Sequence, residues 1–294
     1  MEIELLFVKT VKSLTSGEHR GRSEGTGFDF VGLRDWQSGD RFSSIDWAQS
    51  SITNFSPLMV REFDQPAAAN VVVVADHSSS TRCAINGQSI EAVHAHAIAT
   101  IGLSAVFFQD SFGLITFRSR DGLAVDEFEA VSPRIGKGHV VRCLQAYEYG
   151  TGLESLRRAD RLSDTLAGFM RSTTLIPFVS DFLFPHPHNV LEELSRLNAV
   201  HDVFVVLIDA AFAFALPRVG SGWLRVADVE TGAQRVISRG DLVRLHRNVV
   251  EWQDEVERAA RDLDLDVVRL GPDSTQSDLA LAEFVVARRL RKAS

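Results

Sequence analysis

The sequence has few of the features that mark secreted, membrane-spanning or thiolate-metal proteins. Only two of its 294 residues are cysteines, Cys83 and Cys143, and they form no Cys-x-x-Cys pair, which argues against a disulfide framework or a thiolate zinc site. No apolar run reaches the roughly 18 residues that a membrane-spanning helix needs. The first ten residues, MEIELLFVKT, carry acidic residues where a signal peptide carries basic ones. We therefore expect a cytoplasmic protein without an integral membrane segment, with attachment to the membrane surface as the alternative.

The chain also lacks an excess of positive charge. Its net charge is −8 and its isoelectric point is about 5.6, whereas a general nucleic-acid surface needs a basic stripe. Hydrophobic residues make up 45% and charged residues 24% of the chain, which is ordinary for a soluble globular protein. A length of 294 residues suits one large α/β domain or two small ones.

One stretch, VVVVADHSSST from Val71 to Thr81, organises the chain. A short, continuously apolar and β-branched run predicts a strand that is buried on both faces, as in the centre of a parallel sheet. Ligands bind outside the carboxyl ends of such strands. Asp76 is the first polar residue beyond that end, and Ser78 and Ser80 follow at a spacing of two.

The pattern Asp-x-Ser-x-Ser has two interpretations. A hard divalent cation such as Mg²⁺ takes oxygen ligands and keeps waters where the protein supplies none, so one carboxylate and two hydroxyls suit it. Asp and Ser also close turns and cap helices by accepting hydrogen bonds from backbone N–H groups. The metal interpretation needs further ligands elsewhere in the chain.

Further strands and helices alternate along the chain, which predicts an α/β fold with a mainly parallel central sheet sandwiched by helices. Asp181 follows the second all-apolar strand, and Thr151 lies in a glycine-flanked loop that we expect to precede a helix. Five oxygen-bearing side chains could therefore converge at one edge of the sheet. The predicted strands are 71–75, 114–117, 175–179, 203–207 and 266–270, and the predicted helices are 89–109, 140–147, 153–170, 187–198, 241–263 and 279–291.

Two segments lie outside this alternation. We expect residues 1–66 to form an aromatic-rich β extension. This extension should pack on the core domain of residues 67–294, because the segment is too short to have a core of its own. Its acidic residues stand close to Arg34 and to large apolar groups, so we expect an internal Arg–Asp network. Near 216–238, two short strands around Glu230-Thr231-Gly232 predict an inserted β-hairpin.

The order and spacing of the five oxygen-bearing residues resemble the metal-ion-dependent adhesion site of von Willebrand factor type A domains, which have a Rossmann-like fold. The resemblance implies that Mg²⁺, or Mn²⁺ or Ca²⁺, binds at this set. Thr151 departs from the pattern, because its loop YGTGLES replaces the more usual Gly-Thr-Asp. The matching residues are Asp76, Ser78, Ser80, Thr151 and Asp181.

A narrower resemblance covers nearly the whole chain. The stretches GRSEGTGFDF and LRDWQSGDRFSSIDWAQSS resemble the signature of the domain-of-unknown-function 58 family, and VSDF at 179–182 also fits. Arg41 and Ser44 depart from it, since the family often has an acid and an arginine there, and many relatives carry two N-terminal membrane helices that we do not expect here. The signature residues include Arg22, Ser23, Arg34, Gly39, Asp40, Asp46 and Trp47.

This family resemblance implies a non-enzymatic adaptor. Similar proteins are encoded beside MoxR-type AAA+ ATPases, and the pair is thought to remodel client complexes or help insert metals or cofactors. Two other functions stay open. Asp76 could be the nucleophile of a haloacid-dehalogenase-like hydrolase, although that family needs a second Asp where Ser78 stands. The chain could also be a structural scaffold with an empty metal site.

Overall fold

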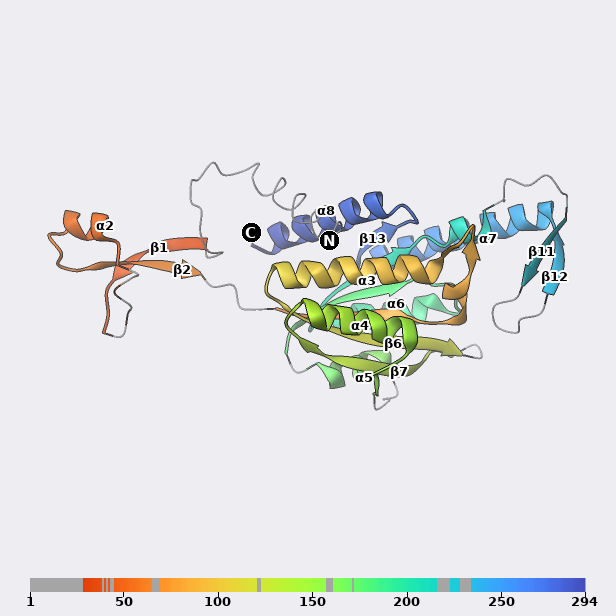
Figure 1. The fold of residues 1–294 in the computed structure, drawn as a ribbon, viewed down its shortest axis with the longest axis horizontal. Coiled ribbons are helices and arrows are strands. Elements are labelled where there is room, and N and C mark those ends of the chain that lie inside the picture. The colour runs from red at the N-terminus through yellow and green to blue at the C-terminus, as the bar shows by residue number, and fades with distance from the viewer. Residues whose placement is uncertain are drawn as a thin grey trace. The chain divides into compact units, whose positions relative to one another are not determined.

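The structure is a computed structural model that describes residues 29–38, 40, 42, 45–64, 69–120, 123–156, 161–170, 172–215, 223–227 and 234–293. The chain divides into two compact units (Figure 1). One covers the described residues between His19 and Ala68, and the other covers those from Ala69 onward. The boundary lies two residues beyond the predicted one, and each unit is described by itself.

The smaller unit is an antiparallel pair of strands with a short helix between them. β1 (Asp29–Asp35) pairs with β2 (Met59–Asp64), and α2 (Trp47–Ile52) lies in the connection. Asp46 begins this helix, because its Oδ1 accepts hydrogen bonds from the backbone N–H groups of Ala48 and Gln49 at 3.1 Å.

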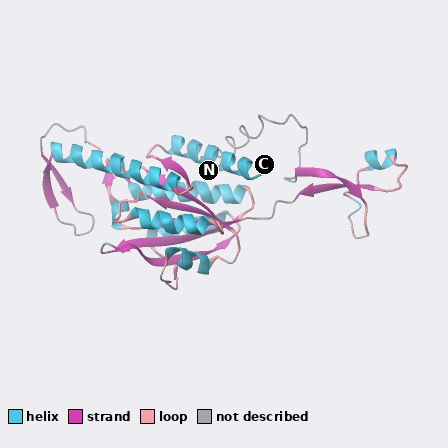
Figure 2. Cartoon of the chain, turned by 180° about the vertical axis from the view of Figure 1, so that it is seen from behind, coloured by secondary structure: helices cyan, strands magenta, loops and turns pink. Residues whose placement is uncertain are grey.

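The larger unit is built on a mainly parallel central sheet, as the sequence predicts, and this sheet has seven strands (Figure 2). The strand order is β13-β10-β9-β3-β6-β7-β8. The five strands from β13 to β6 run parallel, and β7 and β8 pair antiparallel at one side. The strands are β3 (Asn70–Asp76), β6 (Ser111–Arg120), β7 (Leu123–Arg134), β8 (Glu154–Ser155), β9 (Thr174–Ser180), β10 (Asp202–Ile208) and β13 (Asp266–Leu270).

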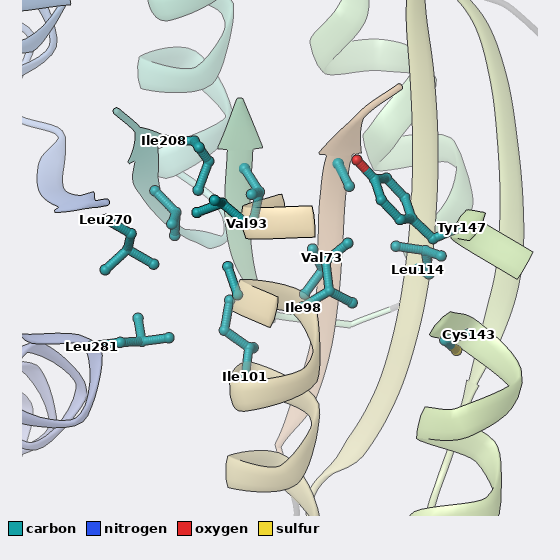
Figure 3. Packing of buried hydrophobic residues seen from close by; sticks show 14 of the residues in the cluster. Val73, Val93, Ile98, Ile101, Leu114, Cys143, Tyr147, Ile208, Leu270 and Leu281 are labelled. Carbon is teal, nitrogen blue, oxygen red and sulfur yellow. The ribbon is translucent and has the colours of Figure 1, made fainter. Parts of the chain in front are cut away.

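Helices cover both faces of this sheet and create two cores. Side chains of β3 alternate between them: Val71 and Val73 face the first core, and Val72 and Val74 face the second. Figure 3 shows the first core, where α3, α4 and α8 supply the covering side chains. α5 and α6 cover the second core, and α7 contributes to both. The helices are α3 (Ile90–Phe107), α4 (Lys137–Tyr149), α5 (Leu162–Phe169), α6 (Pro187–Asn198), α7 (Arg239–Asp262) and α8 (Ser274–Ala293).

The order of the strands fixes where a ligand site belongs. From β3 the chain proceeds to β6 on one side, whereas β9, β10 and β13 follow one another on the other side. The helices after β3 and β9 also lie on opposite faces, since α3 lines the first core and α6 the second. The pair β3–β9 is therefore a switch point, and open α/β sheets bind ligands outside the carboxyl ends of such a pair.

Shorter elements connect these strands and helices. The predicted hairpin is present as the antiparallel pair β11 (Trp223–Ala227) and β12 (Gln234–Ser238). Ser238 then caps α7, since its hydroxyl accepts from the N–H of Asp241 at 3.1 Å. The remaining short elements are η2 (Ser79–Arg82), β4 (Ala84–Ile85), β5 (Gln88–Ser89) and η3 (Ala211–Phe214).

One predicted helix starts later than expected. The sequence predicts a helix directly after Gly152, but β8 follows there and α5 begins only at Leu162. Gly150 has φ 64° and ends α4 in the left-handed conformation that glycine adopts without strain. Thr151 thus follows the end of one helix and does not precede another.

Within the part of the chain that the structure describes, one helix passes the length and composition test for a membrane span. This helix is α3, and 56% of it is buried inside the protein. Its Ile90 and Ile98 belong to the first core and are fully buried. A central helix of an α/β sheet passes the same test, so the finding identifies α3 as the core helix.

Candidate metal site at the switch point

Two buried carboxyl groups lie at the carboxyl ends of the central strands. Asp76 is the last residue of β3, and Asp181 follows the last residue of β9. The strands pair in parallel with Ala75 opposite Val179, so both residues leave the sheet at the same edge. The side chains of Asp76 and Asp181 have no exposed surface, which is unusual for aspartate without a charged partner.

Both oxygens of Asp76 accept hydrogen bonds. Oδ1 accepts from the backbone N–H of Ser78 at 2.8 Å, and Oδ2 accepts from the hydroxyl of Ser180 at 2.7 Å. The backbone carbonyl of Asp76 accepts from the hydroxyl of Tyr147 at 2.9 Å. These bonds fix both the backbone and the carboxyl group of Asp76 at the strand end.

The two serines of the Asp-x-Ser-x-Ser stretch lie next to this carboxyl group. Ser78 is buried, and its backbone carbonyl accepts from the hydroxyl of Thr81 at 2.8 Å, which closes the turn into η2. Ser80 is half-buried, and its hydroxyl donates to Asp181 Oδ1 at 3.4 Å. The turn and the site are therefore one structure, and the two interpretations of this stretch are compatible.

Asp181 is incompletely satisfied. Its Oδ1 accepts from Ser80 and from the backbone N–H of Leu183 at 2.9 Å. Its Oδ2 is buried and has no hydrogen-bond partner among the described residues. A buried carboxyl oxygen without a partner carries a large desolvation penalty, so this atom points to a ligand.

Both carboxyl groups have a raised pKa. Burial and, after it, the neighbouring Asp76 carboxyl together raise the pKa of Asp181 to about 7. Burial also raises the pKa of Asp76, opposed by hydrogen bonds from Ser78 and Ser180. Two carboxyl groups that disfavour each other's ionisation gain from a cation between them.

The last predicted ligand lies at the same edge of the sheet but is not joined to the others. Thr151 is exposed, and among the described residues no hydrogen bond links its side chain to either aspartate. It is connected to the site through α4, since Tyr147 of this helix contacts Asp76. Figure 3 shows the Tyr147 hydroxyl beside the end of β3, the strand that carries Val73. The structure thus brings together Asp76, Ser78, Ser80 and Asp181, and places Thr151 nearby without a contact.

Sequence reasoning missed two residues that orient the site. Ser180 stands directly before Asp181, at the end of a buried strand. A hydroxyl group buried there needs a hydrogen-bond partner, and this signal could have identified Ser180. Tyr147 is one of two tyrosines in the chain and is fully buried in the last turn of α4. A tyrosine on the apolar face of a helix indicates a buried hydrogen bond, and this signal could have identified it.

A second group of polar side chains stands beside Asp76. Arg118 donates to Nδ1 of His77 at 3.3 Å, and Nε2 of His77 lies 3.7 Å from a carboxylate oxygen of Glu91. Burial lowers the pKa of His77, and the nearby cations Arg118 and Arg82 lower it further. The imidazole of His77 is therefore neutral near pH 7.

The two histidines of α3 bond groups of the protein itself. Nδ1 of His94 bonds the backbone carbonyl of Ile90 at 3.0 Å, and burial lowers the pKa of His94 to about 4. Nε2 of His96 lies 2.8 Å from Asp278 of α8. Within the described ranges, no group of three or more His, Cys, Asp or Glu residues that could hold a metal occurs. A site here therefore depends on two carboxylates and neutral hydroxyls.

This donor set fits a hard cation such as Mg²⁺. Carboxylate and hydroxyl oxygens are the ligands that Mg²⁺ accepts, with waters in the remaining positions. Asp181 Oδ2 has no hydrogen-bond partner among the described residues and is available as a ligand atom. Asp76, Ser78, Ser80 and Asp181 are the residues that would hold the ion.

The signature residues of the smaller unit form contacts of a different kind. Both guanidinium nitrogens Nη1 and Nη2 of Arg34 donate to Asp40 at 2.7 Å, and this contact lowers the pKa of Asp40 to about 2. Asp46 caps α2, and the Trp47 side chain is 57% exposed. The predicted network residues Arg22, Ser23 and Gly39 lie outside the described residues.

Comparisons with known proteins identify a family whose function is unknown. The family model described as "Protein of unknown function DUF58" matches residues 32–255. No curated protein matches the chain. The hypothetical protein BatB from Bacteroides thetaiotaomicron is 13% identical, with 75% of this chain and 98% of that chain covered and a TM-score of 0.42. An aerotolerance-related membrane protein from Bacteroides fragilis is 11% identical, with 74% and 98% covered and a TM-score of 0.41.

Proposed function

For this chain, which belongs to the DUF58 family of proteins of unknown function, we propose the function of a non-enzymatic, metal-dependent protein-binding adaptor. The ion is Mg²⁺, or Mn²⁺ or Ca²⁺ in its place, and it binds to Asp76, Ser78, Ser80 and Asp181. Thr151 joins this set directly or through a water when the ion is bound. The partner is another protein, and the ion supplies the positive charge that attracts an acidic side chain of that partner.

One observation carries this proposal. Asp181 Oδ2 is buried without a hydrogen-bond partner, and it belongs to a pair of fully buried carboxyl groups at the switch point of the sheet. A buried pair of carboxyl groups with hydroxyl neighbours is suited to hold an ion, because the ion offsets both charges and the hydroxyl groups add neutral ligands. Ser80 and Ser180 supply such hydroxyl groups, and Ser78 donates its backbone N–H to Asp76.

The charge of the site explains why a partner takes part. Two carboxylates just offset a divalent ion, and the hydroxyl ligands are neutral. The ion remains electrophilic and accepts one more carboxylate in place of a water. Such a contact gains far more than a surface ion pair, because both charges are partly removed from water when the interface closes.

The partner that we propose is a MoxR-type AAA+ ATPase, together with a client complex that the pair remodels, assembles or supplies with a metal or cofactor. The resemblance of the signature stretches is the support for this choice. An ATPase supplies the energy for remodelling, and this chain, which has no Gly-Lys-Ser/Thr phosphate loop, supplies the contact with the client.

Titration calorimetry with Mn²⁺ and Mg²⁺ tests the metal site. We compare the wild-type protein with Asp76→Ala and Asp181→Ala, and use Asp164→Ala on α5 as a matched control because Asp164 is exposed. The wild type and the control should bind one ion with equal affinity, and the two site variants should lose binding. Equal binding by all four proteins would sink the assignment.

Generic phosphate esters test the hydrolase alternative. We expect no turnover by the wild type above the level of Asp76→Ala in Mg²⁺. Turnover that disappears in Asp76→Ala would favour a nucleophilic Asp76 over an adaptor.

A further inference from the structure

We propose that Trp252 and Gln253, two consecutive residues of α7, are positioning residues that hold the Asp181 loop in its metal-binding conformation. This inference rests on the proposed function and deepens it. It assigns part of the site's geometry to a helix that contributes no ligand.

The loop that carries Asp181 is strained. Phe182 has a φ of 55°, in the left-handed region that residues with a side chain rarely adopt. Its ring is fully buried and lies 5.6 Å from the ring of Phe178 on β9, measured between the ring centroids. A bulky residue keeps such a backbone only where its surroundings hold it, so the contacts around Phe182 are needed to keep the loop in place.

Gln253 provides three of the contacts that hold this edge of the sheet. Its side chain has no exposed surface. Nε2 donates to the backbone carbonyl of Asp181 at 2.9 Å and to that of Ile208, at the end of β10, at 2.8 Å. Oε1 accepts from the backbone N–H of Ala210 at 3.1 Å. One amide group thus ties the ends of β9 and β10 together at the residue that carries the carboxylate.

Trp252 holds the next peptide of the same loop. Its Nε1 donates to the backbone carbonyl of Phe182 at 2.8 Å, and its ring is 36% exposed. The backbone N–H of Phe182 donates to the hydroxyl of Ser180 at 2.9 Å, and that hydroxyl also binds Asp76. The strained residue is therefore fixed on its N–H side by the site and on its carbonyl side by α7.

These contacts determine where the Asp181 carboxyl group lies. The carbonyl groups of Asp181 and Phe182 are consecutive, so bonding both to α7 fixes the orientation of the peptide between them. Trp252 holds the next peptide, between Phe182 and Leu183, by its carbonyl group. In this orientation the N–H of Leu183 bonds Asp181 Oδ1, and Oδ2 stays free for the ion. If α7 releases the loop, Phe182 relaxes and the carboxyl group moves away from Ser80 and Asp76.

The experiment uses the full chain and two measurements. Gln253→Met keeps the length of the side chain and removes these three hydrogen bonds together with a longer one of 3.5 Å from Arg269 Nη2 to Oε1. Trp252→Phe keeps an aromatic ring and removes one hydrogen bond. Val256→Ala is the control, because Val256 is a buried residue of the same helix that faces the second core. Mn²⁺ affinity comes from calorimetry, and amide hydrogen exchange at Phe182 and Leu183 in the metal-free protein reports on the loop.

Residues that orient metal ligands typically change affinity by about 10- to 100-fold when they are replaced. We expect a loss in this range for Gln253→Met, a smaller loss for Trp252→Phe, and faster exchange at Phe182 and Leu183 in both. Val256→Ala should lower the melting temperature and leave Mn²⁺ affinity within about twofold of wild type, well short of that range.

The outcomes separate this inference from the function on which it rests. Absence of Mn²⁺ binding by the wild type would overturn the proposed metal site itself. If the wild type binds Mn²⁺ and both α7 variants bind it with the same affinity, only the positioning role is overturned. If Gln253→Met does not fold, the test rests on Trp252→Phe. A Trp252→Phe protein with the Mn²⁺ affinity and the amide hydrogen exchange of the wild type would contradict the inference.

Discussion

The Ser180 hydroxyl donates to Asp76 Oδ2 at 2.7 Å, across the parallel strands β9 and β3 and a sequence separation of 104 residues. The same hydroxyl accepts from the backbone N–H of Phe182 at 2.9 Å. Ser180 is completely buried. One hydroxyl group therefore connects the two carboxyl-bearing strand ends, although it was not among the predicted ligands.

Replacing Ser180 with alanine should destabilise the protein. The change leaves the Phe182 N–H and Asp76 Oδ2 without these partners in a fully buried position, which typically costs about 1–3 kcal/mol. Urea denaturation measures the loss. Ser195→Ala serves for comparison, because the Ser195 hydroxyl is only half-buried and bonds a single carbonyl, that of Leu263. A Ser180→Ala protein as stable as the wild type would show that the buried bond contributes nothing.

Divalent ions should stabilise the folded protein. A ligand at 100 times its dissociation constant adds about 2.7 kcal/mol to the free energy of unfolding when it binds only the native state. Thermal unfolding in excess Mg²⁺ and in EDTA measures this difference for the wild type and for Asp181→Asn. The gain should disappear in Asp181→Asn, and an equal gain in both proteins would place the ion elsewhere.

The partner should depend on the ion. Affinity capture from the native cell with tagged protein should recover a MoxR-type ATPase or its client in Mg²⁺, with loss of the partner in EDTA and in Asp76→Ala. Asp164→Ala should retain the partner. A partner that stays bound under all these conditions would use another surface, and the ion would serve only the loops.

The contact between His96 and Asp278 should make stability depend on pH. The hydrogen bond to Asp278 raises the pKa of His96 above its ordinary value of 6.5. The stabilisation is therefore fully present below pH 6.5 and is lost as the pH rises through the higher pKa of the folded protein. His96→Gln should lower the melting temperature more at pH 5.5 than at pH 8.5, and the exposed His188 provides the matched control, His188→Gln. Equal losses at both pH values would contradict a charged contact.

Arg288 should be essential for docking α8 on the sheet. Its guanidinium group, 10% exposed, bonds Asp202 of β10 and Asp266 of β13. Breaking a buried pair by removing one partner costs about 3–5 kcal/mol, and we expect the lower end for Arg288→Met because the Asp266 side chain is 35% exposed. Denaturant unfolding measures the change. A loss as small as that of a surface substitution would mean that the two aspartates reach water.

The prediction that residues 1–66 pack on the core domain has its own test. Within the smaller unit, Phe42 and Ile52 are 71% and 74% exposed, which leaves apolar surface for a further contact. We expect limited proteolysis to spare the junction near Gln65. Release of a 67–294 fragment that keeps the melting temperature of the whole chain would contradict the prediction.

The sheet could be predicted because its strands are chemically unambiguous. Val71 to Ala75 are buried on both faces, so the run contains no polar residue and cannot be confused with a half-exposed strand. The same holds for residues 176–179 of β9 and 203–207 of β10. Alternation with helices then gives a parallel sheet, and the carboxyl ends of adjacent strands place Asp76 and Asp181 at one edge.

Other features depend on contacts that the sequence does not encode locally. The sequence Gly150-Thr151-Gly152 predicted the start of a helix, whereas Gly150 ends α4. Glycine occurs near both ends of helices, and only the left-handed φ of Gly150 identifies it as the end of a helix. Gln253 offered a clearer signal. It stands between Val249 and Val256 in the buried stripe of α7, and a polar residue in that stripe indicates a buried hydrogen-bonding role.

The antiparallel strand β7 has a consequence for the field at the site. In an ordinary parallel unit, the helix that follows a strand starts at the carboxyl edge of the sheet and presents its N-terminal, positive end there. Here β7 returns the chain first, so α4 reaches that edge with its C-terminal turn, which carries Tyr147 beside Asp76. The end of a helix with unpaired carbonyls carries about half a negative charge and favours a cation by about 0.3–1 kcal/mol. The reversal of one strand thus adds negative potential to the site without another acidic residue, and an acidic partner of the kind that we propose should approach from the side away from α4.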